Sequence, residues 1–79
     1  MMILHVFGET HTANVIRDGV QTLLLAHPRT LELLQDACEI EEPVWVNSTL
    51  CRVKSVQEPE LISLDRLLEV EFEVLDGLH

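Results

Sequence analysis

The sequence predicts a small α+β domain in which a largely antiparallel sheet of about four strands carries two helices on one face. Two patterns favour this fold. Two segments repeat apolar residues at spacings of three and four, which is typical of helices, and one segment near the C-terminus alternates between apolar and acidic residues, which is typical of a half-buried strand. We expect a single domain over residues 1–79, because no repeat or low-complexity linker divides the chain.

The first expected element is a strand over residues 2–7. The run is almost entirely apolar and β-favouring, and Gly8 then interrupts it. His5 is its one clearly polar residue, so the run is nearly continuous rather than alternating. Such runs are typical of strands that are covered on both faces, and we expect this strand to lie in the centre of the sheet.

Two structures compete for residues 10–27. Their apolar residues share one helical stripe and a proline follows them, so the first prediction is a helix with a threonine as its N-cap. The pair Asp18-Gly19 instead favours a hairpin turn between strands at 13–16 and 20–26. Gly19 inside a helix would also cost about 1 kcal/mol relative to alanine. With that hairpin, the fold becomes a mostly-β meander with one helix.

A helix beginning at Thr30 is indicated more clearly. Threonine is a common N-cap, and Glu32 in the first turn complements the positive end of the helix dipole. Leu34 and Cys38 share an apolar face. Pro43 sets the limit of this helix, because proline cannot continue one.

A hairpin and a third, short helix are expected next. Residues 44–46 and 49–56 form the two strands of the hairpin, with Asn-Ser at residues 47–48 as a two-residue turn. Residues 58–66 are expected to form the short helix, with Pro59 in its first turn.

Residues 68–74 form the best-defined strand in the sequence. Even positions are apolar and odd positions are glutamates, so one face is expected in the core and the other carries a row of carboxylates. Neighbouring carboxylates in the row lie about 6.6–6.8 Å apart along the strand. The row consists of Glu69, Glu71 and Glu73, with Asp65 and Asp76 at its flanks. We predict that it attracts a protein partner with a basic surface.

Two interpretations stay open for the candidate binding residues. The glutamate row is either a docking surface or an ordinary solvated face that Arg52 and Lys54 on a neighbouring strand partly neutralise. Trp45 either belongs to the core or anchors an interface, and we include it among the partner-binding residues.

The net charge of −9 lies entirely in residues 30–79, since residues 1–29 carry two acids and two cations. An acidic surface repels phosphate backbones and anionic lipids, so we expect neither direct nucleic-acid binding nor membrane binding. The first residues have neither a positive segment nor a long apolar run, so no signal peptide or anchor is predicted and the expected location is cytoplasmic.

No catalytic, cofactor or metal motif is legible in the chain. It lacks P-loop, GxGxxG, GxSxG, HExxH and CxxC patterns. His5, His11 and His27 lie close in sequence but not at spacings typical of metal ligands. Cys38 and Cys51 are expected to be free thiols. We therefore expect no enzymatic activity, no cofactor and no metal.

The leading functional hypothesis is a non-enzymatic protein-interaction module, a small acidic adaptor or regulator that forms a homodimer. A sharper version is an inhibitor that occupies a basic, nucleic-acid-binding surface of its target, as phage and mobile-element proteins of this size and charge can do. The alternative is a structural subunit of a larger homo-oligomeric or phage-type assembly. A small enzyme or a metal-binding protein is the third hypothesis.

Overall fold

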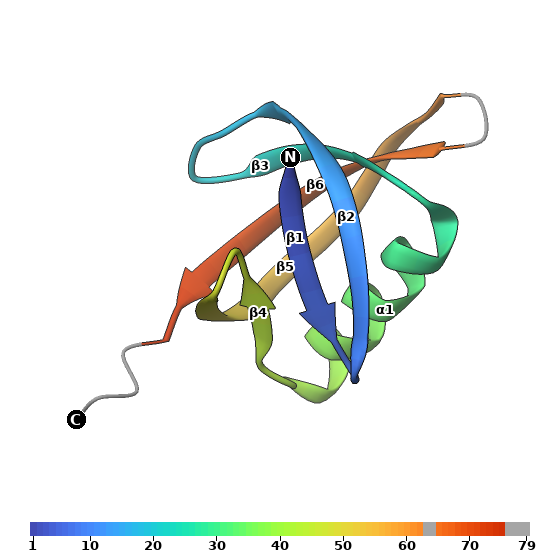
Figure 1. Cartoon of the computed structure of the whole chain (residues 1–79). Helices are drawn as coiled ribbons and strands as arrows, with labels where there is room; N and C mark the ends of the chain where they lie inside the picture. The colour runs from blue at the N-terminus through green and yellow to red at the C-terminus, as the bar shows by residue number, and fades with distance from the viewer. Residues whose placement is uncertain (63–64, 76–79) are drawn as a thin grey trace.

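The computed structural model describes residues 1–62 and 65–75, and their side chains except those of residues 59–62, 65 and 66. In this part of the chain there are six strands and one helix (Figure 1). In chain order they are β1 (Met2–Val6), β2 (Glu9–Arg17), β3 (Thr22–Ala26), α1 (Pro28–Ile40), β4 (Val44–Val46), β5 (Thr49–Ile62) and β6 (Asp65–Val74).

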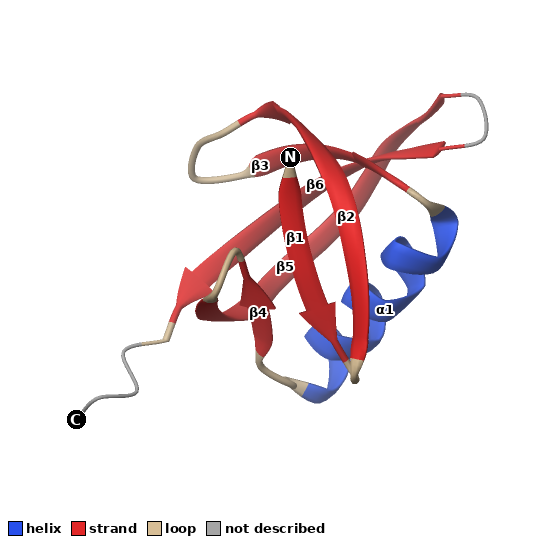
Figure 2. Ribbon diagram, viewed as in Figure 1, coloured by secondary structure: helices blue, strands red, loops and turns tan. Residues whose placement is uncertain are grey.

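The strands close into a barrel in the order β1-β2-β3-β6-β5-β4. Two three-stranded meanders, one before and one after α1, are joined by the pairs β3–β6 and β1–β4, and every pairing is antiparallel. The prediction of an α+β sheet with two helices on one face is therefore wrong, because the protein is mostly β with a single helix (Figure 2). The alternative of a mostly-β chain is nearer, although the meanders close into a barrel.

The predicted helix over residues 10–27 is wrong, because this segment forms β2, a turn and β3. The turn over residues 18–21 contains the Asp-Gly pair. The Asp18 carboxylate accepts a hydrogen bond of 2.9 Å from the Gly19 N–H. Ala13 and Leu24 point into the barrel, whereas Ile16 stays exposed. The apolar residues that fit one helical stripe thus divide between the two faces of a hairpin.

Strand β1 is not covered on both faces as predicted. Its burial alternates along the strand, with Met2, Leu4 and Val6 inside the barrel and Ile3 and His5 outside. The outer side of a barrel faces solvent, so a nearly continuous apolar run leaves part of itself exposed.

The hairpin around residues 47–48 is confirmed, since Val46 pairs with Thr49 across the turn. Asn47 and Ser48 have φ values of 48° and 72°. Two positive values are typical of a type I′ turn, whose backbone twist matches that of the flanking strands. Strand β5 continues beyond residue 56, so the predicted short helix over 58–66 is wrong. The β5–β6 register shifts between Gln57 and Glu60, where Pro59 has no N–H for the ladder.

The helix predicted from Thr30 exists, but it begins two residues earlier and has a different cap. His27 is the N-cap, and its Nδ1 accepts a 3.0 Å hydrogen bond from the Arg29 N–H. Pro28 occupies the first helical position, where a missing N–H costs nothing. Thr30 lies in the first turn and is buried.

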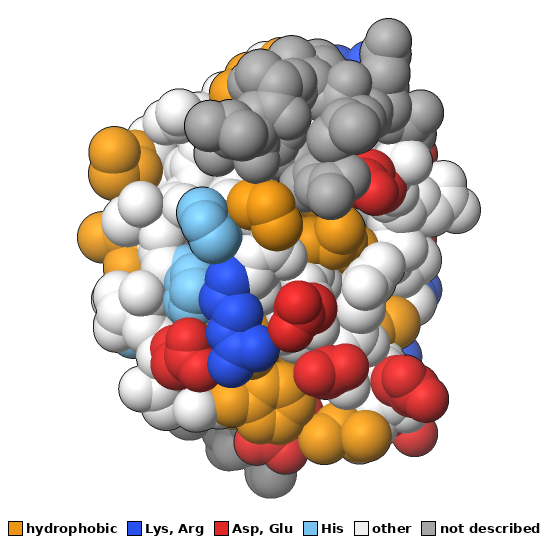
Figure 3. Space-filling view, turned by 90° about the vertical axis from the view of Figure 1, so that its right-hand side faces the viewer, with side chains coloured by type: hydrophobic (Ala, Val, Ile, Leu, Met, Phe, Trp, Pro, Cys, Tyr) orange, Lys and Arg blue, Asp and Glu red, His pale blue; other side chains and the backbone are white. Residues whose placement is uncertain are grey.

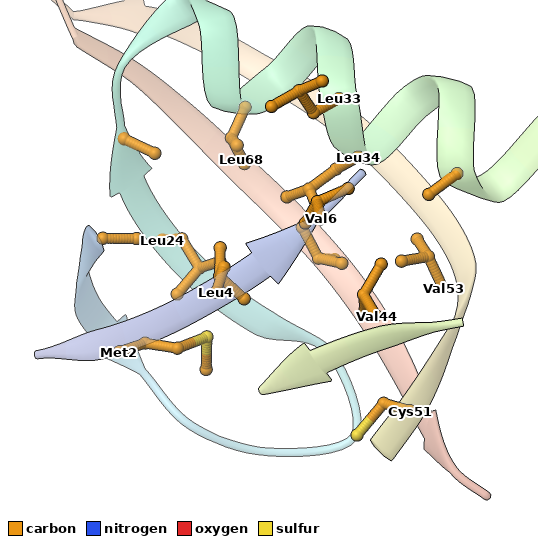
Figure 4. Close-up of a cluster of buried hydrophobic side chains, with 14 residues drawn as sticks. Met2, Leu4, Val6, Leu24, Leu33, Leu34, Val44, Cys51, Val53 and Leu68 are labelled. Atoms are coloured by element: carbon orange, nitrogen blue, oxygen red, sulfur yellow. The ribbon is translucent and has the colours of Figure 1, made fainter. Parts of the chain in front are cut away.

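Helix α1 closes one end of the barrel. Leu33 and Leu34 extend from the helix towards Val6 and Leu68 on the barrel strands (Figure 4). Leu34 and Leu68 are fully buried, so the contact between helix and barrel is part of the core. At the other end Cys51, near the start of β5, is also buried.

Candidate interaction surface

Each carboxylate of the predicted glutamate row faces a cation on the outer surface of the barrel. Lys54 and Arg52 lie on the adjacent strand β5, at 3.6 Å from Glu71 and 2.9 Å from Glu73. Arg17 reaches Glu69 at 3.7 Å from the end of β2, across Leu23 of β3. Each carboxylate of the row therefore has a counterion, although Arg52 is shared with Glu41 of α1's C-terminal cap.

These ion pairs offset the negative charge from which the partner-binding role of the row is predicted. Arg52 and Lys54 are the cations of the alternative interpretation, in which the row is a solvated polar face. Asp65 lies in β6, where its backbone pairs with Ile62, and its side chain is outside the described part. Asp76 lies outside the described residues. The structure thus brings together three of the predicted acids, but as half of an ion-paired face.

Trp45 lies on the outer surface of the barrel. Its side chain is 47% exposed, while its neighbour Val44 is fully buried and Val46 packs against the core. The three-residue strand β4 cannot bury both faces, because one of them is the outside of a barrel. The interpretation of Trp45 as a core residue is wrong.

Trp45 has one polar and two apolar neighbours on this surface. His5 of β1 and Leu50 of β5 are its directly paired neighbours, and Ile3 is its diagonal neighbour. We refer to Ile3, His5, Trp45 and Leu50 as the Trp45 face. Ile3 is 43% exposed, and Phe7, two residues beyond His5, is 42% exposed. Exposed apolar side chains thus lie on both sides of His5 in the chain, at Ile3 in β1 and at Phe7 in the turn that follows it.

Hydrogen bonds hold the backbone beneath the Trp45 face in place. Ile3 and Asn47 bond twice, because the Ile3 N–H donates to Asn47 Oδ1 at 2.8 Å and the Asn47 N–H donates to the Ile3 carbonyl at 2.9 Å. His5 Nδ1 and the Thr10 hydroxyl lie 2.9 Å apart. These bonds fix the backbone and the His5 ring beneath the tryptophan, which suits a preformed contact surface.

Acidic side chains gather where α1 ends and leads into β4, the strand that carries Trp45. Glu41 binds Arg52 at 3.3 Å, whereas Glu39 and Glu42 have no ion-pair partner among the described residues. The view onto α1 shows acidic side chains next to exposed apolar ones (Figure 3).

A polar network at the start of α1 has the order carboxylate, imidazole, hydroxyl. Glu9 Oε1 is 3.0 Å from His11 Nε2, and His11 Nδ1 is 3.0 Å from the Thr30 hydroxyl. A carboxylate only accepts, so neutral His11 donates through Nε2 and accepts the Thr30 proton at Nδ1. This order is found in nucleophilic triads, but Thr30 is only 1% exposed and no substrate can reach its hydroxyl. The network instead ties β2 to the helix.

Arg29 completes this network from the helix side. Its guanidinium donates to Glu9 at 2.9 Å and to Glu32 at 3.0 Å. The hydrogen bond from Arg29, and next that from His11, hold the pKa of Glu9 below its ordinary value. Glu9 therefore stays ionised and anchors α1 against β2.

The remaining histidines and cysteines do not converge. His5 contacts Thr10 and His27 caps α1, and within the described residues no group of three or more His, Cys, Asp or Glu side chains could hold a metal ion. Cys38 and Cys51 are free. In the described part of the chain, no helix has the length and apolar character needed to cross a membrane.

Sequence reasoning missed Ile3 and Phe7 as surface residues. The available signal was His5, which lies between them at the same strand parity and marks that side as outward.

No protein-family description, curated protein or solved structure matches the chain.

Proposed function

We propose that this chain is a non-enzymatic protein-interaction module that binds a protein partner through the Trp45 face. The observation that carries the proposal is a half-exposed tryptophan on the outer surface of the barrel, with the exposed side chain of Ile3 at a diagonal position on β1. Tryptophan is enriched among interface residues that dominate binding energy, because it offers a large apolar area with few rotatable bonds.

The proposed partner presents basic side chains around an apolar centre. Glu39 and Glu42, which precede β4 and have no ion-pair partner in the described part of the chain, and the net charge of −9 support this choice. Charges at a rim chiefly accelerate association and select the partner, while the apolar centre supplies the affinity. The partner can be a basic nucleic-acid-binding protein, which the acidic chain would inhibit by covering its surface.

The test compares three immobilised chains in affinity capture from the native host: wild type, Trp45→Ala and Ile16→Ala. Ile16 is a matched control, because it is also an exposed apolar residue but lies on β2 beyond the residues that pair with β1. We expect a basic protein that wild type and Ile16→Ala retain and Trp45→Ala loses. With the purified partner, Trp45→Ala should weaken binding by about 2 kcal/mol, or roughly 30-fold.

Two outcomes separate the alternatives. Equal retention by Trp45→Ala and wild type, with both chains folded by circular dichroism, would remove the Trp45 face from the function. Sedimentation velocity on the purified chain tests whether the chain associates with itself. A dimer that Trp45→Ala abolishes and Ile16→Ala preserves would make the partner a second copy of this chain.

A further inference from the structure

The end of the barrel opposite α1 contains a cavity of about 330 Å³. Its walls come from the ends of the strands and from the β2–β3 turn, so it lies where the barrel is not closed by the helix. Among its lining residues are Met2, Thr22, Val46, Cys51 and Phe72, together with residues 18–20 of the turn. Mouths of barrels are frequent ligand sites, and this volume is at the small end of the usual range.

The inner part of the cavity is mostly apolar, with the buried Thr22 as its polar member. Met2 and Cys51 are buried, and Phe72 packs partly against the core. Burial raises the pKa of the Cys51 thiol, which therefore stays protonated and donates weakly to the Thr49 carbonyl at 3.6 Å. This side of the cavity offers no charge to a ligand and favours an aliphatic or aromatic group.

The outer part of the cavity combines exposed apolar side chains with one acid. Val20 is 83% exposed and Val74 is 65% exposed, so a ligand above the cavity would cover apolar area that now faces water. Asp18 is the one charged residue among the described lining residues. Its carboxylate accepts a hydrogen bond from the Gly19 N–H and has no ion-pair partner in the described part of the chain. A positive group fits here, whereas a ligand anion would meet an uncompensated carboxylate.

We infer that the open end of the barrel binds a small amphipathic amine, with its apolar body between Met2, Val46 and Phe72 and its ammonium group at Asp18. The site is separate from the Trp45 face, because Val46 points into the barrel while Trp45 points out of it. Failure of one proposal therefore leaves the other unaffected.

The test is a titration of the full chain with hexylamine, 1-hexanol and hexanoate at neutral pH and constant ionic strength, followed by methyl NMR. The three probes share one apolar chain and differ in charge. We expect shifts of the Met2, Val20, Val46 and Val74 methyl groups. Hexylamine should bind about three-fold more tightly than hexanol, as for an exposed ion pair, and about tenfold more tightly than hexanoate.

Two matched variants separate the local charge from the overall charge. Asp18→Asn keeps an oxygen that can accept from the Gly19 N–H but removes the carboxylate, so it should abolish the preference for hexylamine over hexanol. Asp36→Asn changes the net charge equally from the exposed surface of α1, and it should leave that preference intact.

Three results would overturn the inference. The first is the absence of shifts at the cavity methyl groups up to the solubility limit of hexylamine. The second is binding of hexanoate as tight as that of hexylamine. The third is an equal loss of preference in Asp18→Asn and Asp36→Asn, which would reduce the effect to the overall charge of the chain.

Discussion

The two ends of the barrel differ in how they are closed. At one end α1 inserts Leu33 and Leu34 among the strands, and Leu68 of β6 is fully buried beneath them. At the other end β6 continues to Val74, which is 65% exposed, and a cavity lies between the strands. The same alternating strand therefore supplies both a fully buried leucine and a solvent-exposed valine.

This difference shows that alternation decides which way a side chain points, and that the covering element decides whether it is buried. Leu68 and Val74 both lie on the inward-facing side of β6. Only the former has a helix above it. We therefore expect the helical end to carry most of the stability and the open end to be free for binding.

The largest expected effect comes from shortening a side chain at the helical end. Leu34→Ala removes a fully buried side chain and should lower the free energy of unfolding by about 2–5 kcal/mol, because it leaves a cavity in the core. Val74→Ala at the open end should change it by less than about 0.5 kcal/mol. Urea denaturation measures both. Similar losses at the two ends would contradict the comparison.

The cap of α1 should have the next largest effect. His27→Ala removes the acceptor for the Arg29 N–H and should cost about 1 kcal/mol of stability. His27→Asp restores an acceptor and places a negative charge at the positive end of the helix dipole, so its stability should match or exceed that of wild type. Thermal melts of the three proteins measure this. If His27→Ala were as stable as wild type, or more stable than His27→Asp, His27 would not hold the helix in place.

The network that ties α1 to β2 should make stability depend on pH. Because Arg29 and His11 lower the pKa of Glu9 in the folded state, ionised Glu9 stabilises the fold above its unfolded-state pKa, and this contribution is lost as the pH falls through the folded-state value. Glu9→Gln should therefore melt a few degrees below wild type at neutral pH, and the gap should close in acid. Glu42→Gln, without an ion-pair partner among the described residues, is the control. A gap that persists unchanged in acid would argue against this role.

The smallest expected effect is at the open end. Arg17 and Glu69 form a long ion pair of 3.7 Å, and the Arg17 side chain is largely exposed. Arg17→Ala should change the free energy of unfolding by less than about 0.5 kcal/mol, since exposed ion pairs contribute little. Urea denaturation measures this change, and the loss measured for Leu34→Ala gives the scale for comparison. A loss of unfolding free energy above about 1 kcal/mol would mean that the open end contributes more to stability than exposed ion pairs normally do.

Local sequence patterns predicted several elements well. The apolar face with Leu34 marked a helix, and the Asn-Ser pair at residues 47–48 marked a hairpin. The alternation over residues 68–74 marked a strand. These signals are legible because each depends on neighbours within a few positions of the chain. Residues 10–27 were misjudged because the same apolar spacing fits a helical stripe and a hairpin, and only pairing with β1 and β6 stabilises the second.

The candidate site was predictable only in part. Trp45 was named from its residue type, but its outward direction depends on β4 closing the barrel between β1 and β5. The pairing of Glu69 with Arg17 joins residues that are distant in the sequence and separated by a strand in the sheet. No local pattern contains that information.

The sequence by itself determined the acidic charge, the amphipathic helix and the alternating strand, because these are properties of residue type and short-range spacing. The tertiary structure alone decided that the sheet closes, that the glutamates meet cations, that Trp45 faces solvent and that one end of the barrel stays open. Each of these depends on which strands become neighbours, and antiparallel pairing between distant segments is set by the burial of the whole core rather than by any one segment.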